Sequence, residues 1–336
     1  MIGYYVHHVG RGHLHRATAL ARHWVATRGE EVTGLSSLPR PDDWPGPWVS
    51  LAPDDASPAE PVDPTANGIL HWAPLGDDGM LERTASLSAW LASARPRAVV
   101  VDVSVEVLLS VRLHGVPVVS VVLPGVRTDQ AHLIGLDAAT GLVSAWPSAP
   151  EASGMLPGMP HDVLDRIVTV GAVSRLPVAA AGSAGHDGPR RAVLLQGRGG
   201  DAMTDLDAGG LAARCPGWEW TVLGGKGEWV ADPVPFLAVA DVVVTAAGQG
   251  SIADLAALRR PCVVVPADRP HAEQATTVRV LDAGPWPVVV CDSVDEAITP
   301  AVLERAASLD GGDWASWCDG LAVERFAAEV ERVALP

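Results

Sequence analysis

Lysine is almost absent from this sequence: Lys226 is the only lysine in 336 residues, so arginine supplies nearly all of the positive charge. This absence excludes, as a broad option, chemistry built on a lysine, such as a Schiff base or a phosphate-loop lysine. Acidic residues also outnumber basic ones by 40 to 24, for a formal net charge of −16. Since nucleic-acid binding depends on Lys and Arg that neutralise phosphates, we expect no nucleic-acid partner. Contact with an anionic membrane is expected to be peripheral at most.

Long apolar runs and cysteine motifs are missing as well. The best apolar stretch, residues 98–111, is interrupted by Asp102 and Glu106, whereas a membrane-spanning helix needs roughly 18 or more apolar residues. The first eight residues lack the basic start and apolar core of a signal peptide, so we expect a cytoplasmic protein. The four cysteines show no Cys-x-x-Cys spacing and no paired histidines nearby, which argues against a zinc site and predicts reduced thiols.

The sequence does contain an alternation of short apolar runs with helical patterns. Near-continuous Val, Ile and Leu runs separated by helices are typical of parallel sheets covered on both faces. Residues 39–64, rich in Pro and Asp, are predicted to form a surface loop, and a helix is predicted near residues 203–214. The predicted strands are residues 2–6, 32–35, 98–103, 116–122, 192–196, 220–224, 242–245, 262–265 and 288–290. The pattern predicts an α/β fold with two Rossmann-like doubly wound domains facing across a cleft.

Small, flexible residues gather between the two predicted domains. The run Ala-Ala-Ala-Gly-Ser-Ala-Gly at residues 179–185 lies in a segment that we interpret as a linker over residues 171–191. The N-terminal domain then covers residues 1–170 and the C-terminal domain residues 192–320. Residues 321–336 form a closing helix.

The strongest chemical feature is a strand, glycine turn and helix start over residues 242–254. Backbone N–H groups at a helix N-terminus, with the helix dipole behind them, suit a phosphate, and glycine lets the anion approach closely. Ser251 would cap the helix or donate its hydroxyl, and Asp254, one turn later, would reach a ribose hydroxyl. The turn is not Gly-x-Gly-x-x-Gly, so the dinucleotide fingerprint is not met. Taken alone, the segment is equally compatible with a turn that uses glycine only for packing.

The surrounding residues resemble the donor-binding region of the GT-B glycosyltransferases. The similarity is to the N-acetylglucosaminyltransferase of the peptidoglycan lipid intermediate and to natural-product glycosyltransferases, and it covers roughly residues 192–291. In the expected order come a turn at residues 227–230, the strand Ala-Asp-Val-Val-Val at 240–244, the strand Pro-Cys-Val-Val-Val-Pro at 261–266 and the pair Glu273-Gln274. The loop after the first strand of the C-terminal domain, Gly197-Arg198-Gly199, also resembles the glycine loop that the family has there. Arg198 would add a charge-assisted contact to a pyrophosphate.

The resemblance implies a set of donor-binding residues. They are Gly197, Arg198, Gly199, Trp229, Val230, Gly248, Gln249, Gly250, Ser251, Asp254, Glu273 and Gln274. Three departures concern the base and sugar of the donor: Asp254 stands where the family often has Glu, Arg260 replaces a usual Gly, and the Asn after the Gln is absent. We expect the donor to be a UDP-sugar, with a thymidine diphosphate sugar as the alternative.

The turn after the first strand carries a candidate base. The family's glycine turn there often ends in Gly-His, and Gly12-His13 matches it. Imidazole titrates near neutrality, so His13 would take a proton from an attacking hydroxyl. Asp102, at the end of a strand, would orient the imidazole or instead cap the next helix, with Glu106 as a solvated or capping neighbour. His15 is the alternative base, and no metal is expected at these histidines, because no carboxylate or cysteine lies near them in the sequence.

The resemblance implies an inverting transfer from the nucleotide-sugar, which is a substrate and not a cofactor, to a small-molecule or lipid-linked hydroxyl acceptor. The N-terminal domain would bind the acceptor, and the final helix would pack back on that domain. No obligatory metal is implied, because helix N-termini and arginine can hold the leaving group. Two alternatives stay open: a non-catalytic nucleotide-sugar-binding subunit, and a nucleotide-sugar 2-epimerase on the same fold.

Overall fold

The computed structural model describes residues 1–55, 60–180, 188–197, 203, 205–225, 227, 230 and 232–336. Three of the predicted donor-binding residues, Arg198, Gly199 and Trp229, lie outside this set.

The first sheet has seven parallel strands, in the order β3-β2-β1-β4-β5-β6-β7. They are β1 (Ile2–Tyr5), β2 (Val32–Ser36), β3 (Trp48–Ser50), β4 (Val99–Asp102), β5 (Val118–Val122), β6 (Gly141–Ser144) and β7 (Ile167–Thr169). The four predicted strands are present. The prediction of one continuous loop over residues 39–64 was wrong, because β3 lies inside it and extends the sheet beyond β2. Trp48 and Val49 are the only consecutive apolar residues of β3, and two such residues are too few to mark a strand in a Pro-rich segment.

The second sheet has five parallel strands, in the order β12-β11-β10-β8-β9. They are β8 (Arg190–Leu195), β9 (Trp218–Leu223), β10 (Val242–Thr245), β11 (Cys262–Val264) and β12 (Val288–Val290). All five were predicted. The central strand β10 is fully buried, as its unbroken valines indicate for a strand covered by helices on both faces.

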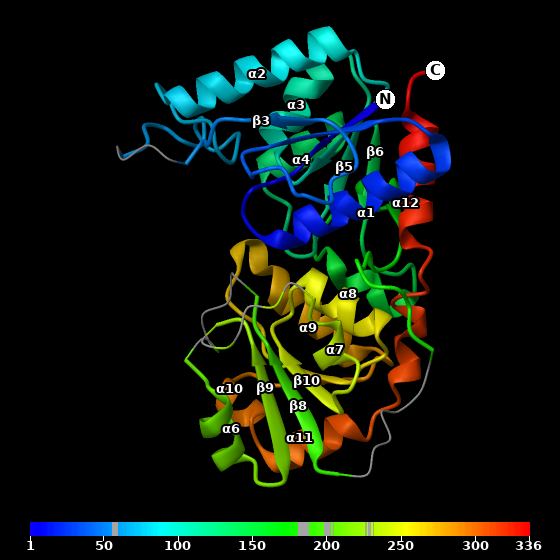
Figure 1. Cartoon of the computed structure of the whole chain (residues 1–336). Coiled ribbons are helices and arrows are strands. Elements are labelled where there is room, and N and C mark those ends of the chain that lie inside the picture. Colours follow the sequence, from blue (N-terminus) through cyan, green and yellow to red (C-terminus); the bar gives the residue numbers. More distant parts are fainter. Residues whose placement is uncertain are drawn as a thin grey trace.

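Helices cover both sheets (Figure 1). They are α1 (Arg11–Arg28), α2 (Asp78–Ala94), α3 (Val105–Leu113), α4 (Gln130–Ala138), α5 (His161–Leu164), α6 (Ala208–Arg214), α7 (Val234–Leu237), α8 (Gln249–Ala257), α9 (Glu273–Ala283), α10 (Val294–Ala297), α11 (Pro300–Ala307) and α12 (Ala322–Val333), with 3-10 turns η1 (Pro150–Met155), η2 (Pro270–Ala272) and η3 (Gly311–Ser316). The helix predicted near residues 203–214 begins only at Ala208, because the Asp207 side chain caps it by accepting the N–H of Gly210. Within the described residues, no helix has both the length and the apolar character needed to cross a bilayer.

The last helix returns to the first sheet. α12 packs alongside α1 and against β5 and β6, as Figure 1 shows for the red and blue helices. Phe326 is buried, and its ring lies edge-on to Tyr4 with the centroids 6.5 Å apart. Glu331 adds ion pairs to Arg28 and Arg97. The chain end therefore belongs to the core of the first sheet, and the polypeptide crosses between the two halves twice.

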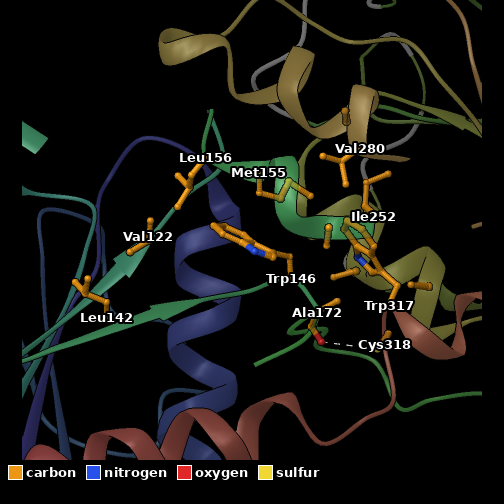
Figure 2. Packing of buried hydrophobic residues seen from close by; sticks show 14 of the residues in the cluster. Val122, Leu142, Trp146, Met155, Leu156, Ala172, Ile252, Val280, Trp317 and Cys318 are labelled. Atoms are coloured by element: carbon orange, nitrogen blue, oxygen red, sulfur yellow. Dashed lines mark hydrogen bonds between the residues drawn. The ribbon is translucent and has the colours of Figure 1, made fainter. Parts of the chain in front are cut away.

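The two halves share apolar packing at one edge of their boundary. Trp146 and Met155 from the N-terminal half belong to the same buried cluster as Ile252, Val280 and Trp317 from the C-terminal half (Figure 2). The connecting segment is tied there as well, since the N–H of Ala172 donates to the carbonyl of Trp317 at 3.1 Å. This packed edge fixes how the first turns of α1 and α8 approach each other.

Candidate active site at the boundary between the two sheets

His13 and Asp102 meet at the carboxyl end of the first sheet. Asp102 is the last residue of β4 and is fully buried, and His13 lies in the first turn of α1, which follows β1. Nδ1 of His13 lies 2.8 Å from Oδ1 of Asp102. Arg16 Nη2 lies 3.2 Å from the same nitrogen, but a carboxylate only accepts, so the shorter contact requires Nδ1 to carry the proton. The lone pair is therefore on Nε2.

Two residues that the sequence reasoning missed complete this cluster. Arg16 donates from Nε and Nη2 to the two oxygens of Asp102 at 3.0 and 2.9 Å, and the Tyr4 hydroxyl donates to Oδ2 at 3.1 Å. Burial alone would raise the pKa of Asp102, but the charge of Arg16, followed by that of His13, more than offsets it and holds the pKa well below its usual range. The signal available was spacing, because residues three apart on a helix share a face and His13 and Arg16 are so placed.

The backbone turns sharply immediately after Asp102. Val103 has φ 66°, a left-handed conformation that a β-branched residue rarely adopts and that costs on the order of 1–3 kcal/mol. Ser104 caps α3 by accepting the N–H of Val107, so the alternative that Asp102 is the helix cap was wrong. Glu106 accepts the backbone N–H groups of His71 and Trp72 at 2.8 and 3.0 Å and so holds the loop before α2.

The N-termini of two helices from the two halves face each other beside this cluster. Gly10 precedes α1 with φ 91°, and Gly248 precedes α8; neither helix start receives a side-chain cap from the described residues. A Cβ added to Gly250 would lie 3.8 Å from the Cα of Gly12, and Arg16 Nη1 donates to Oε1 of Gln249 at 3.3 Å. The first amides of each helix, which have no partner within their own helix, and two positive dipole ends thus converge at one place, which is an arrangement suited to an anion.

Ser251 does not cap α8, contrary to one of its two expected roles. Gly248 occupies the cap position, because the helix starts at Gln249 and places Ser251 already inside the first turn. Its other expected role, a hydroxyl donor to a ligand, stays a prediction. His15 lies two positions after His13 on α1, and residues two apart on a helix do not face the same side. Its expected role as the alternative base stays a prediction.

The carboxylate of Asp254 is hydrogen-bonded to the segment that connects the two halves. Its carboxylate accepts from the Ser174 hydroxyl at 2.8 Å and from Arg175 Nε at 3.1 Å. Burial raises the pKa of Asp254 although Arg175 and the hydrogen bond from Ser174 oppose the shift. Both oxygens have partners, so this residue anchors α8 to the connection between the halves.

Gln274 lies at the start of α9 and joins two loops. Its Oε1 accepts the N–H of Ala247, after β10, at 3.1 Å and that of Ala267, after β11, at 2.8 Å. Its neighbour Glu273 lies 3.6 Å from Nη2 of Arg127, a residue of the N-terminal half. Two further predicted donor residues, Gly197 and Val230, lie after β8 and before α7, and Val230 packs partly buried against the core.

A cavity of about 290 Å³ opens in the N-terminal half, next to His13. Its wall includes Leu51, Trp72 and His7, and the ring centroid of His7 is 5.7 Å from that of His13. Burial, reinforced by the neighbouring His13 and His8, lowers the pKa of His7 to about 4, so its imidazole is neutral near neutral pH. The exposed area of the cavity wall is mostly apolar, and described residues between Leu51 and Trp72 contribute one side of it.

Comparison with known proteins bears on the fold. No protein-family model matches the chain, and no curated protein matches it by sequence. The crystal structure of MurG from Acinetobacter baumannii matches with 16% identity and a TM-score of 0.64, covering 98% of this chain and 99% of that one. The glycotransferase of kitacinnamycin matches with 19% identity and a TM-score of 0.61, covering 99% of both chains.

A third similar structure is spinosyn rhamnosyltransferase SpnG complexed with thymidine diphosphate. It has 15% identity and a TM-score of 0.59, and the match covers 99% of this chain and 96% of that one. The strand orders and the near-complete coverage confirm the predicted fold class: the chain has the two-domain α/β fold, GT-B, of these glycosyltransferases.

Proposed function

We propose that this protein is an inverting glycosyltransferase that moves a sugar from a nucleoside-diphosphate sugar to a hydroxyl acceptor. The observation that carries the proposal is the His13–Asp102 pair at 2.8 Å, placed beside two helix N-termini that converge from the two halves. A base and an anion site side by side are what this reaction requires. They also favour an enzyme over a non-catalytic binding subunit, which has no need of an imidazole that a buried carboxylate orients.

In this mechanism the acceptor lies in the cavity next to His13, and Nε2 removes the hydroxyl proton as the oxygen attacks the anomeric carbon of the sugar. Asp102 holds the imidazole in the required tautomer and stabilises the imidazolium that forms. The bond to the nucleoside diphosphate breaks on the opposite face of the sugar, which inverts the configuration. The negative charge that develops on the leaving phosphate is stabilised by the first amides of α8.

A UDP-sugar is the donor that the sequence resemblance favours, while the thymidine diphosphate in the structure of SpnG supports testing both bases. The experiment is a thermal-shift titration with UDP and TDP, with uridine and thymidine as controls. A diphosphate at 100 times its dissociation constant should stabilise the protein by about 2.7 kcal/mol. Equal shifts with the free nucleosides would remove the phosphate site from the proposal.

Substituting Gly250 tests the anion site at α8. Gly250→Asp places a carboxylate in the first turn, where it suits the helix dipole but repels a phosphate. One added charge about 5 Å from a phosphate is worth about 3 kcal/mol at an effective dielectric of about 20, so nucleoside-diphosphate affinity should fall about 100-fold while stability is kept. Calorimetric titration measures the affinity. Gly250→Asn is the matched neutral control, and an equal loss in both variants would point to steric hindrance and not to charge.

Replacing Gln274 with alanine should loosen the two loops that its oxygen joins. The variant leaves the buried N–H of Ala247 and that of Ala267 without their acceptor, which should lower the free energy of unfolding by about 1–3 kcal/mol. Urea denaturation measures this loss. Gln130→Ala, at an exposed position at the start of α4, is the control and should stay within about 0.5 kcal/mol of the wild type. If the two variants were equally stable, Gln274 would have no such role.

A further inference from the structure

Three histidines from distant parts of the chain meet where the two halves touch. His71 lies in the loop before α2, His132 in α4 and His271 in η2 of the C-terminal half. Each offers a ring nitrogen, and the three nitrogens lie within 4.8 Å of one another. The rings of His71 and His132 pack edge to face at 4.3 Å between centroids, and those of His132 and His271 at 4.6 Å. No step of the proposed transfer uses them.

The hydrogen bonds of His132 leave its imidazole in the form that binds metals. Nη1 of Arg127 lies 2.9 Å from Nε2 of His132. Because a guanidinium can only donate, Nε2 of His132 must accept this hydrogen bond with its lone pair. Nδ1 then carries the proton and donates to Oδ2 of Asp129 at 2.5 Å. Burial lowers the pKa of His132 to about 4, against the opposing hydrogen bond to Asp129, and burial also lowers the pKa of His271. Both rings are therefore neutral near neutral pH, as metal ligands must be.

Asp129 lies behind the three rings. Besides His132, its carboxylate contacts Nε2 of His71 at 3.0 Å and approaches Nδ1 of His271 at 4.0 Å. Burial would raise the pKa of Asp129, but its hydrogen bonds from His132 more than offset this, so the group stays ionised. A carboxylate that accepts the second ring N–H of a histidine is the usual support of a metal-binding imidazole.

The backbone holds His271 against the N-terminal half. His271 has φ 60°, a strained conformation for a residue other than glycine, and the N–H of Val126 donates to its carbonyl at 2.7 Å. Gly125, with φ 113°, permits this approach, because a Cβ there would lie 2.3 Å from the same carbonyl oxygen. The main chain thus holds the third histidine at the boundary, in addition to the contacts of its ring with His132 and His71.

We propose that His71, His132 and His271 form a site for a divalent transition metal, with Zn²⁺ as the best fit, that bridges the two halves of the protein. Imidazole nitrogens suit zinc, and three histidines leave a fourth position for water in tetrahedral geometry. Bonds of about 2.0–2.1 Å place the ligand nitrogens of a tetrahedral site about 3.4 Å apart, so the three rings must turn to bring their nitrogens together around the metal. The metal replaces Arg127 as the partner of His132 Nε2, and Arg127 has Glu273, 3.6 Å away, as its remaining ionic partner.

A second group with suitable atoms, His8 with Asp54 and Asp55, is a weaker candidate. The Asp54 carboxylate already pairs with Arg83 at 2.5 Å, so a cation there would face a neutralised ligand and a nearby positive charge. In the three-histidine group the neighbouring positive charge is that of Arg127, and the carboxylates of Glu273 and Asp129 compensate it. The two groups can be told apart by substitution.

Zinc binding is testable without any sugar transfer, so its failure would leave the proposed function untouched. The protein is stripped with a chelator and titrated with Zn²⁺ in a calorimeter, and Co²⁺ is added separately to look for the visible absorption of a tetrahedral site. The wild type should bind one Zn²⁺ at this site and gain thermal stability. His71→Ala, His132→Ala and His271→Ala should each weaken binding by about 100-fold or more, and Asp129→Asn by about 10-fold to 100-fold.

The controls are His114→Ala, at an exposed position after α3, and His8→Ala, in the second group; both should bind Zn²⁺ like the wild type. Circular dichroism of each variant in chelator checks that the fold is kept. A wild type that binds no Zn²⁺ would overturn the proposal. So would wild-type affinity in the triple histidine variant, or a loss caused by His8→Ala alone. Loss in His71→Ala and His132→Ala with wild-type affinity in His271→Ala would remove the bridge between the halves.

Discussion

Replacing His13 with alanine is expected to slow sugar transfer by about 10²-fold to 10⁴-fold, the range over which a positioned general base contributes. The imidazole is fixed by its 2.8 Å contact with Asp102, so its loss removes the proton acceptor and nothing else in the cluster. Arg16 still pairs with Asp102 in the variant, and stability should change little. The measurement is the rate of nucleoside diphosphate release from UDP-sugars and TDP-sugars, with an acceptor or with water.

His15→Ala is the matched control, because it removes an imidazole from the same turn of α1. It should keep the wild-type rate, and donor affinity should be equal in both variants. A His13→Ala enzyme with the wild-type rate would remove His13 from its role. A loss confined to His15→Ala would transfer the role to that residue.

Asp102→Ala is expected to lower the free energy of unfolding by about 3–5 kcal/mol, because it leaves the guanidinium of Arg16 buried without its carboxylate. It also removes the acceptor of the Tyr4 hydroxyl. Chemical denaturation at neutral pH measures the loss. Asp137→Ala, whose side chain is 68% exposed in an ion pair with Arg166, is the control and should cost within about 0.5 kcal/mol. Equal effects of the two substitutions would contradict the buried ion pair.

The pH dependence of the same variant has a defined sign. The folded-state pKa of Asp102 lies below its usual range, so the stabilising contribution of the carboxylate is complete above the unfolded pKa of about 3.9 and is lost as the pH falls through the folded pKa. The stability difference between wild type and Asp102→Ala should therefore shrink as the pH falls below about 4. A difference that grows as the pH falls below about 4 would contradict this assignment.

Local patterns were enough to predict the two parallel sheets and the turns that follow β1 and β10. A run of valines predicts a buried strand from neighbouring residues alone. A glycine turn before a helix can be recognised in the same way. β3, β6 and β7 were not predicted, because each has only two consecutive apolar residues and so lacks the longer valine-rich run that marks the other short strands. They are defined by pairing with neighbours distant in sequence.

In the candidate site, too, some residues could be predicted from the sequence and some contacts could not. His13 and Asp102 were predicted from motifs at strand ends, where parallel sheets gather functional side chains. The partners of Asp254, Ser174 and Arg175, could not be predicted, because the connecting segment is brought to α8 only by tertiary packing. The three-histidine group joins a loop, a helix and a 3-10 turn that lie about 60 and 140 residues apart in the chain, and no spacing rule links them. Such contacts follow from the arrangement of the two halves.

The account rests on the transfer of sugar from a nucleotide-sugar, and its most direct measurement is the nucleoside diphosphate released when the protein is incubated with a panel of UDP-sugars and TDP-sugars. We expect release with at least one donor, slowed in His13→Ala and weakened in donor affinity in Gly250→Asp but not in Gly250→Asn. A protein that binds neither nucleoside diphosphate and releases neither from any donor would contradict the account.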